Sequence, residues 1–259
     1  MFTMLATMVE VKRNSEDRST TRRDRLRAAT REEIVAAAQQ MVADGDELSM
    51  RAVARSVGMT APALYRYVRD HEDLVDQVGG ALYDQLLAEL VAARDAVDAD
   101  DLPGRLTAMA HAFRGWALTH RNEYGMLFAN PLTATLNQAT SRTHQGGQAF
   151  GQVFGEIFAQ LWQRGLIVVP KLEDIDPRLR SMLEASSTTG HELPLPLRYV
   201  FVRQWAKLYG MVTLEAFGHL SWALEDSLAL FEEMLADNHA ELSGGSASGS
   251  PQQQATESA

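Results

Sequence analysis

Apolar residues along this chain recur at intervals of three and four positions, and no stretch alternates as an amphipathic strand does. Alanine, leucine, arginine, glutamate and glutamine, which favour helices, dominate between these positions. The pattern therefore predicts an all-α fold class. The expected helices cover residues 30–44, 49–57, 60–68, 70–90, 106–128, 142–165, 177–187, 197–220 and 223–241.

The second and third of these helices are short and are separated by a tight turn. Ser49 and Thr60 are N-cap residue types at their starts, and Gly58 suits a left-handed residue between them. Before them, Thr30 and Glu33 have the spacing of a capping box, which predicts a longer helix from residue 30. This order favours a three-helix, helix-turn-helix domain, although helix–glycine–helix hairpins also occur in other α-bundles.

In a helix-turn-helix the N-terminal residues of the second helix lie near base edges in the major groove. In this chain those candidates are Thr60, Ala61, Pro62, Ala63 and Arg66. Of these five residues, Arg66 is the one whose side chain can form two hydrogen bonds to a guanine base. The hydroxyls of Tyr65 and Tyr67 suit phosphate oxygens, but aromatic residues on a short helix more often belong to a core.

The segment 48–68, LSMRAVARSVGMTAPALYRYV, closely resembles the DNA-binding domain of TetR-family transcriptional regulators. The resemblance implies an all-helical homodimer that binds a palindromic operator, usually as a repressor. It implies base contacts for the helix start and phosphate contacts for the tyrosines. We add Arg51 and His71 to the candidate DNA contacts. The family often has a phosphate-binding lysine near the position of His71. A neutral histidine would bind phosphate less well than lysine does, and Arg69 is a candidate to make this contact instead.

The C-terminal half resembles the WHG-type C-terminal domain of some TetR-like regulators, in the runs WAKLYG at 205–210 and LEAFGH at 214–219. The two resemblances divide the chain into four expected regions. They are a flexible basic arm at 1–29, the helix-turn-helix domain at 30–77, a ligand-binding and dimerisation domain at 78–242, and a disordered tail at 243–259.

The expected helix 197–220 is apolar around nearly its whole circumference, so it must be covered on every side. A two-fold dimer through this helix and the last one would cover the side that its own core leaves open. The predicted interface residues are Phe201, Leu208, Val212, Phe217, Leu224, Leu228, Phe231 and Leu235.

Regulators of this type usually sense a small molecule, and aromatic walls suit a small apolar or aromatic effector. The candidate pocket residues are Trp116, His120, Tyr124, Phe128, Phe158, Trp162, Trp205 and Tyr209. Aromatic residues at helical spacing also fit an ordinary core. A stripe of Gly147, Gly151 and Gly155 predicts close approach of another helix.

Charge is distributed unevenly along the chain. The formal net charge is −10, yet residues 12–31 hold eight basic and three acidic residues. Because phosphate neutralisation supplies much of non-specific DNA affinity, Arg22, Arg23, Arg25 and Arg27 are candidate DNA contacts. A solvated, unstructured leader is the alternative for this segment.

The remaining features exclude other classes. The chain has no cysteine, so it has no disulfide, thiolate metal site or cysteine nucleophile. Glu215 and His219 have a metal-ligand spacing but lack a second pair, and we expect no metal, no cofactor and no enzyme. Without a signal peptide or membrane span, a cytoplasmic protein is expected.

The function predicted from the sequence is a sequence-specific DNA-binding regulator. It is expected to be a repressor that a small-molecule effector releases from a palindromic double-stranded operator. The alternative is a DNA-binding activator or architectural protein without a small-molecule ligand.

Overall fold

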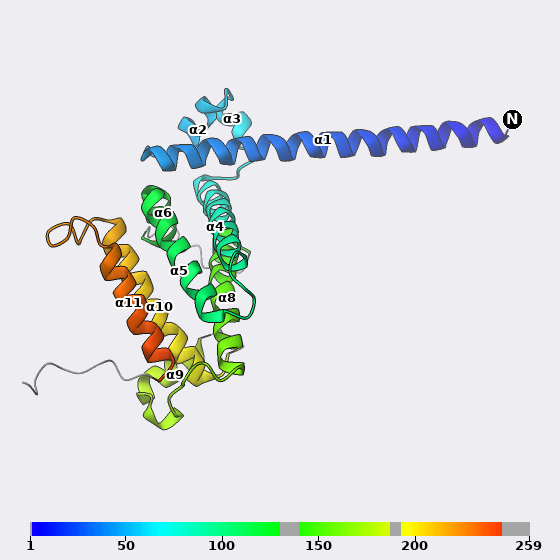
Figure 1. Cartoon of the computed structure of the whole chain (residues 1–259). Helices are drawn as coiled ribbons and strands as arrows, with labels where there is room; N and C mark the ends of the chain where they lie inside the picture. The colour runs from blue at the N-terminus through cyan, green and yellow to red at the C-terminus, as the bar shows by residue number, and fades with distance from the viewer. Residues whose placement is uncertain (1, 130–139, 187–192, 245–259) are drawn as a thin grey trace, which may run out of the picture. The chain divides into compact units, whose positions relative to one another are not determined.

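A computed structural model of the chain describes residues 2–129, 140–186 and 193–244, with side chains from residue 22 onward. Within these ranges the chain forms helices and turns and no strand, which confirms the predicted all-α class. The elements in Figure 1 are α1 (Phe2–Asp44), α2 (Met50–Ser56), α3 (Ala61–Leu64), α4 (His71–Asp95), α5 (Leu102–Thr119), α6 (Arg121–Phe128), α8 (Arg142–Gln163), the 3-10 turn η1 (Leu172–Asp174), α9 (Pro177–Ala185), α10 (Leu195–Ala216) and α11 (Leu228–Leu242). The predicted disordered tail lies, from residue 245, outside the described residues.

The first helix begins much earlier than predicted from the sequence. We expected a flexible arm over 1–29 and a capping box at Thr30, but α1 is continuous from Phe2. Thr30 lies inside it, and its hydroxyl donates to the carbonyl of Leu26 at 2.9 Å. The physical reason is that residues 1–44 contain neither glycine nor proline, so nothing interrupts the helix.

Glycines end the first two helices as predicted. Gly45 and Gly58 have φ angles of +76° and +67°, in the left-handed region that glycine enters without steric cost. Ser49 caps α2, because its hydroxyl accepts a hydrogen bond from the amide of Ala52. These local choices fix the turn between α2 and α3.

The chain divides into two compact units. The N-terminal unit comprises residues 1–82 and 122–144, and the C-terminal unit comprises 83–121 and 145–259. The N-terminal compact unit thus extends beyond the predicted helix-turn-helix domain of residues 30–77, because it also includes residues 78–82, most of α6 and the start of α8. In that unit the fully buried core side chains include Ile34, Ala38, Val53, Leu64, Val68, Leu74, Val78 and Tyr124.

In the C-terminal unit, aromatic rings from α5, α8 and α10 pack on one another. The ring of Phe150 lies 5.3 Å from that of Phe113 and 5.2 Å from that of Trp205. Nearby on α5, Arg114 forms an ion pair with Glu215 of α10, and Ser227 donates a hydrogen bond to the same carboxylate at 2.7 Å. These contacts tie α5, α10 and the start of α11 together.

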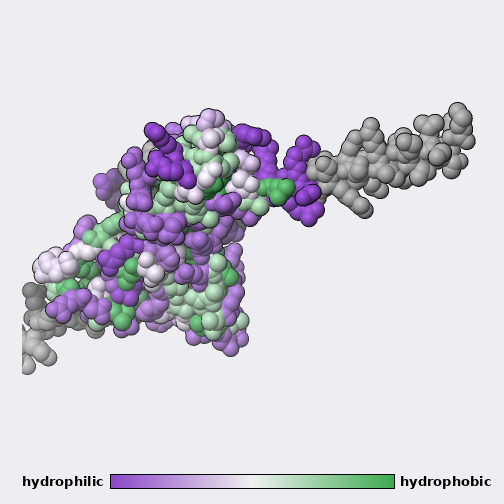
Figure 2. All heavy atoms as spheres, turned by 90° about the horizontal axis from the view of Figure 1, so that it is seen from above, coloured by the Kyte–Doolittle hydropathy of each residue, from purple (hydrophilic) through white to green (hydrophobic). Residues whose placement is uncertain are grey.

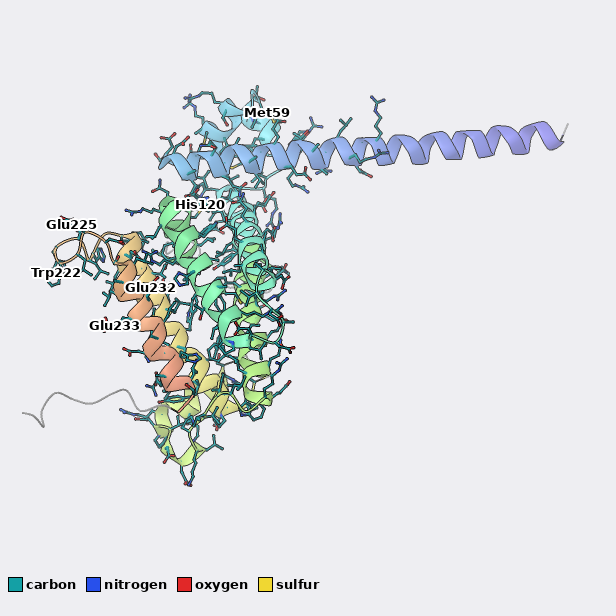
Figure 3. The ribbon with its side chains drawn as sticks, viewed as in Figure 1. Met59, His120, Trp222, Glu225, Glu232 and Glu233 are labelled. Carbon is teal, nitrogen blue, oxygen red and sulfur yellow. The ribbon has the colours of Figure 1, made fainter. Side chains whose placement is uncertain are left out.

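The last two helices are shorter than predicted. α10 ends at Ala216 and α11 starts at Leu228, so residues 217–227 form a connecting segment instead of helix. Gly218 in this segment has a φ of +70°, which ends the helical path. Trp222 is 86% exposed there, and Figure 3 shows it on the segment between α10 and α11.

No helix in the described ranges is both long and apolar enough to span a membrane.

Candidate functional sites

The α2–turn–α3 segment presents its predicted base-contacting residues to solvent. Thr60 and Pro62 are exposed, while Ala61 and Ala63 are partly buried. Pro62 occupies the first turn of α3, where a missing N–H costs no hydrogen bond. Leu64 is fully buried and anchors α3 to the core of the unit. The start of α3 therefore forms a solvent-facing edge on a fixed base.

Arg66 does not lie on α3 as predicted. The helix ends at Leu64, and residues 65–67 continue as a turn in which the amide of Tyr67 donates to the carbonyl of Leu64 at 2.8 Å. Val68, which follows this turn, is fully buried. Tyr65 is 53% exposed and Arg66 is exposed, so both remain accessible beside α3.

Beside this turn lies a surface hollow in the N-terminal unit that is rich in arginine. We call it the arginine hollow, and its charged lining residues are Arg27, Arg31, Arg66, Arg69, Arg142, Asp73 and Asp76. Five arginines against two aspartates leave an excess of positive charge, and Tyr65 and Tyr67 add their phenol groups. Such a surface suits phosphate oxygens, which accept hydrogen bonds from both side-chain types. Arg27 is held there by a 3.2 Å hydrogen bond from Nη2 to the carbonyl of Arg66.

His71 and Arg69 flank the start of α4. The Nε2 of His71 lies 2.8 Å from the carbonyl of Leu48, to which it must donate, so the neutral ring has no N–H left for a phosphate. The side chain of Arg69 is 83% exposed, and its guanidinium lies 3.4 Å from Asp73. Of the two, Arg69 is the better placed cation, and Arg51 is a further exposed cation on α2.

The predicted arm arginines, Arg22, Arg23 and Arg25, lie exposed on α1. In Figure 2 the described end of this helix, next to the grey atoms, is mostly hydrophilic. These three arginines remain candidate DNA contacts, but they lie on a helix and not on the expected flexible arm.

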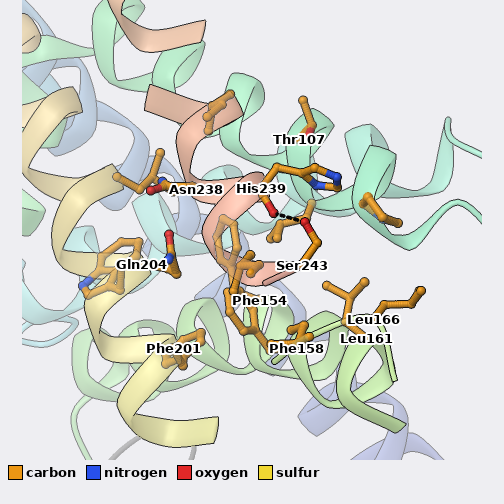
Figure 4. A pocket seen from close by; sticks show the side chains of 17 residues that line it. Thr107, Phe154, Phe158, Leu161, Leu166, Phe201, Gln204, Asn238, His239 and Ser243 are labelled. Atoms are coloured by element: carbon orange, nitrogen blue, oxygen red, sulfur yellow. Dashed lines mark hydrogen bonds between the residues drawn. The ribbon is translucent and has the colours of Figure 1, made fainter. Parts of the chain in front are cut away.

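A largely apolar pocket lies inside the C-terminal unit, partly open to solvent, with a cavity of about 80 Å³. We call it the amide pocket, because Gln204 of α10 and Asn238 of α11 lie in its wall (Figure 4). Phe154 and Phe158 of α8 and Trp205 of α10 supply aromatic walls.

Of the eight predicted pocket residues, only Phe158 and Trp205 line the amide pocket. Trp116 is a core residue at 1% exposure, with His120 stacked against it at 5.2 Å. Tyr209 stacks on Trp205 at 5.6 Å instead of lining the cavity.

Three further predicted pocket residues lie elsewhere. Tyr124 and Phe128 belong to the N-terminal unit, where Tyr124 is fully buried. Trp162 is 39% exposed near the end of α8. Neither amide was among the predicted pocket residues, although a polar residue within an apolar helix face is a visible signal in the sequence.

Half of the predicted dimer residues are core residues of the chain itself. Phe201, Leu208, Val212 and Phe231 are at most 8% exposed, so their side chains are not available to a partner. Leu228 and Leu235 are partly buried, and Leu235 lines the amide pocket. Periodicity marks the apolar faces of helices but does not show which of these faces the chain's own helices cover.

Other apolar side chains near α10 and α11 do reach the surface. Phe217 and Leu224, both predicted, are 39% and 37% exposed in the connecting segment. Leu214, Trp222 and Leu230 are exposed as well, at 41%, 86% and 39%.

The Glu215 and His219 pair is not arranged as two ligands of one ion. Glu215 receives hydrogen bonds from Arg114 and Ser227, while His219 lies beyond the end of α10. The described residues contain no group of three side chains able to hold a metal.

Two family models match the chain. The model of the bacterial regulatory proteins of the tetR family matches residues 28–78, and that of the tetracyclin repressor-like C-terminal domain matches residues 106–238. HTH-type transcriptional regulators of Mycobacterium bovis and Mycobacterium tuberculosis are 36% identical over 85 residues. That match covers 33% of this chain and 36% of each relative, so most of their length lies outside it.

Solved structures share the fold over most of the chain. The regulatory protein SCO4313 has a TM-score of 0.61 at 25% identity and covers 83% of this chain and 97% of its own. A Rhodococcus sp. RHA1 protein of unknown function reaches 0.61 at 22% identity, covering 82% and 95%. FadR from Bacillus subtilis, solved with stearoyl-CoA, reaches 0.55 at 13% identity, covering 81% and 98%. With the C-terminal model matching half of the sequence and the N-terminal model matching the helix-turn-helix, the chain belongs to the TetR family of transcriptional regulators.

Proposed function

We propose that this protein is a homodimeric repressor that binds a palindromic operator and is released from it by a small, mainly apolar effector. The observation that carries the proposal is the solvent-facing start of α3 beside the arginine hollow. Exposed Thr60 and Pro62 face the bases, while the arginines and tyrosines of the hollow bind the phosphates on either side.

The charge distribution supports this orientation. The whole chain has a formal net charge of −10, whereas the arginine hollow has an excess of positive charge. Negative charge elsewhere repels DNA and disfavours binding through other faces. Arg22, Arg23 and Arg25 on α1 add to the phosphate-neutralising charge.

The test separates base recognition from phosphate binding. An operator is first selected from random double-stranded DNA, and affinities for it and for random DNA are then measured by fluorescence anisotropy. Arg66→Ala should relax the preference at one base position in each half-site, at a cost of about 1–3 kcal/mol on the operator. Tyr65→Ala should lower the affinity for operator and random DNA by the same factor.

Arg178 of α9, which pairs with Asp176, provides the control, and Arg178→Ala should change neither affinity. Equal losses for Arg66→Ala on operator and random DNA would make Arg66 a phosphate contact. Failure to select any operator would refute the proposed function itself.

A further inference from the structure

Two residues that line the amide pocket each carry a buried hydrogen-bond acceptor without a donor. Among the described residues, nothing donates to Oε1 of Gln204 or Oδ1 of Asn238. The two side chains are only 7% and 8% exposed, and both line the pocket. A buried acceptor without a donor lowers the stability of the folded protein. Two such acceptors on residues that line a cavity therefore point to a bound molecule that supplies the donor.

The orientation of the Gln204 amide is fixed by its neighbour Glu241. Its Nε2 lies 3.0 Å from Oε2 of Glu241, a carboxylate that also pairs with Arg203 and Lys207. The hydrogen bond from Lys207 keeps the pKa of Glu241 below its usual value, so the carboxylate is ionised at neutral pH. An ionised carboxylate accepts only, so Gln204 must turn its NH₂ toward Glu241 and leave Oε1 as an open acceptor.

Asn238 is oriented by a sulfur atom. Its Nδ2 lies 3.0 Å from Sδ of Met234, a weak acceptor that offers no hydrogen to an oxygen. The amide therefore presents its NH₂ to the sulfur and keeps Oδ1 unpaired. Two side chains that line the pocket, from α10 and α11, thus each carry an acceptor without a donor, and phenylalanine and leucine side chains line the same pocket.

We infer that the amide pocket binds small, uncharged, largely apolar molecules that carry a hydroxyl or N–H donor, and that Gln204 and Asn238 select them through this donor. The inference rests on the proposed function, in which such a molecule is the effector. The cavity of about 80 Å³ is smaller than the ~150 Å³ engineered cavity that holds benzene, but it is partly open to solvent, so a single ring that extends into the opening is the largest suitable probe.

The test uses phenol, anisole and toluene as probes. They share one apolar ring, but only phenol carries a donor. Calorimetric titration of the full chain without DNA should show phenol binding about tenfold more tightly than anisole or toluene, because only phenol satisfies a buried acceptor.

Gln204→Met and Asn238→Leu remove the acceptors and keep the approximate side-chain size. Each should reduce the preference for phenol, and the double variant should bind all three probes alike. Ser243→Ala is the matched control, since Ser243 lines the same pocket but its hydroxyl already donates to the carbonyl of His239 at 2.7 Å. It should keep the full preference.

Thermal unfolding checks that each variant folds. If Gln204→Met does not fold, Asn238→Leu alone decides the outcome, because the partner it loses is the sulfur of Met234 and no charge is left unpaired. Equal affinities of the three probes for the native protein, absence of binding at millimolar probe, or an unchanged preference in the double variant would overturn the inference. Release from operator DNA is measured separately. Binding without release would refute effector control and leave the donor-selective pocket intact.

Discussion

Asp76 links two helices of the N-terminal unit through one carboxylate. Its oxygens accept hydrogen bonds from the amides of Arg142 and Thr143, at 3.0 and 2.9 Å, in the first turn of α8. The hydroxyl of Ser141 donates to the same group at 2.6 Å. A negative charge at a helix N-terminus is favourable, so Asp76 of α4 acts as an external cap for α8.

Asp76→Asn removes this charge and should lower the free energy of unfolding by about 1 kcal/mol at pH 7. Partial burial acts to raise the pKa of Asp76, but the hydrogen bonds from Ser141, Thr143 and Arg142 outweigh it and lower the pKa below 3.8. A lowered folded-state pKa stabilises the protein at pH values above 3.8, and this contribution is lost as the pH falls through the folded-state value. Urea unfolding of both proteins between pH 7 and pH 3 measures the difference, which should shrink at the acidic end.

Asp46→Asn, in the exposed turn after α1, provides the control and should have little effect at either pH. A difference for Asp76→Asn that grows toward acidic pH would contradict the capping role.

At the residue level, the sequence predicted the caps better than the site. Gly45, Gly58 and Ser49 act locally, and their roles follow from residue type alone. The capping box at Thr30 was wrong because the preceding residues also favour helix. Gln204 and Asn238 were missed because their importance arises from burial, which depends on how α10 and α11 pack.

At the level of helices, α4 and α8 approach closely at glycines. An added Cβ at Gly79 would lie 2.4 Å from Oγ1 of Thr143, and one at Gly80 would lie 2.6 Å from Cβ of Arg142. In the C-terminal unit, an added Cβ at Gly146 would lie 2.5 Å from Cβ of Tyr83. The predicted stripe of Gly147, Gly151 and Gly155 therefore lies beside the actual contact. A Cβ at Gly147 would meet ordinary van der Waals distances, and helical spacing alone could not distinguish the neighbouring positions.

Gly146→Ala should destabilise the protein by about 1–3 kcal/mol, because the methyl group would overlap Tyr83 and force α4 and α8 apart. Gly155→Ala in the same helix is the matched control. No described atom lies within 4 Å of its added Cβ, so the gain in helix propensity should stabilise by up to about 1 kcal/mol. Urea unfolding compares the two, and equal or reversed effects would show that the close contact is unimportant.

For the whole molecule, the all-α class and the order of helices followed from the sequence, because amphipathic periodicity persists wherever a helix has one buried face. The division into units did not follow, since α4 and α8 each contribute residues to both units without a break in their pattern. Half of the side chains predicted for the dimer surface are buried within the chain itself. Phe201, Leu208, Val212 and Phe231 already form the chain's own core.

The exposed residues Leu214, Phe217 and Trp222 remain to form the proposed dimer surface, together with Leu224 and Leu230. Large aromatic side chains at this level of exposure are typical anchors of interfaces, and the loss of an anchor costs at least about 2 kcal/mol. Phe217→Asp and Trp222→Asp should therefore weaken dimerisation by roughly thirtyfold or more, as sedimentation equilibrium would measure.

Met182 of α9 offers the matched control, because it is 70% exposed and Met182→Asp adds the same charge outside the proposed surface. It should leave the dimer unchanged. Because two protomers hold two half-sites at once, the monomeric variants should also lose affinity for a full palindrome much more than for a single half-site. If both aspartate variants sediment as the unchanged dimer, the interface lies on another surface, and the exposed apolar segment between α10 and α11 has a different role.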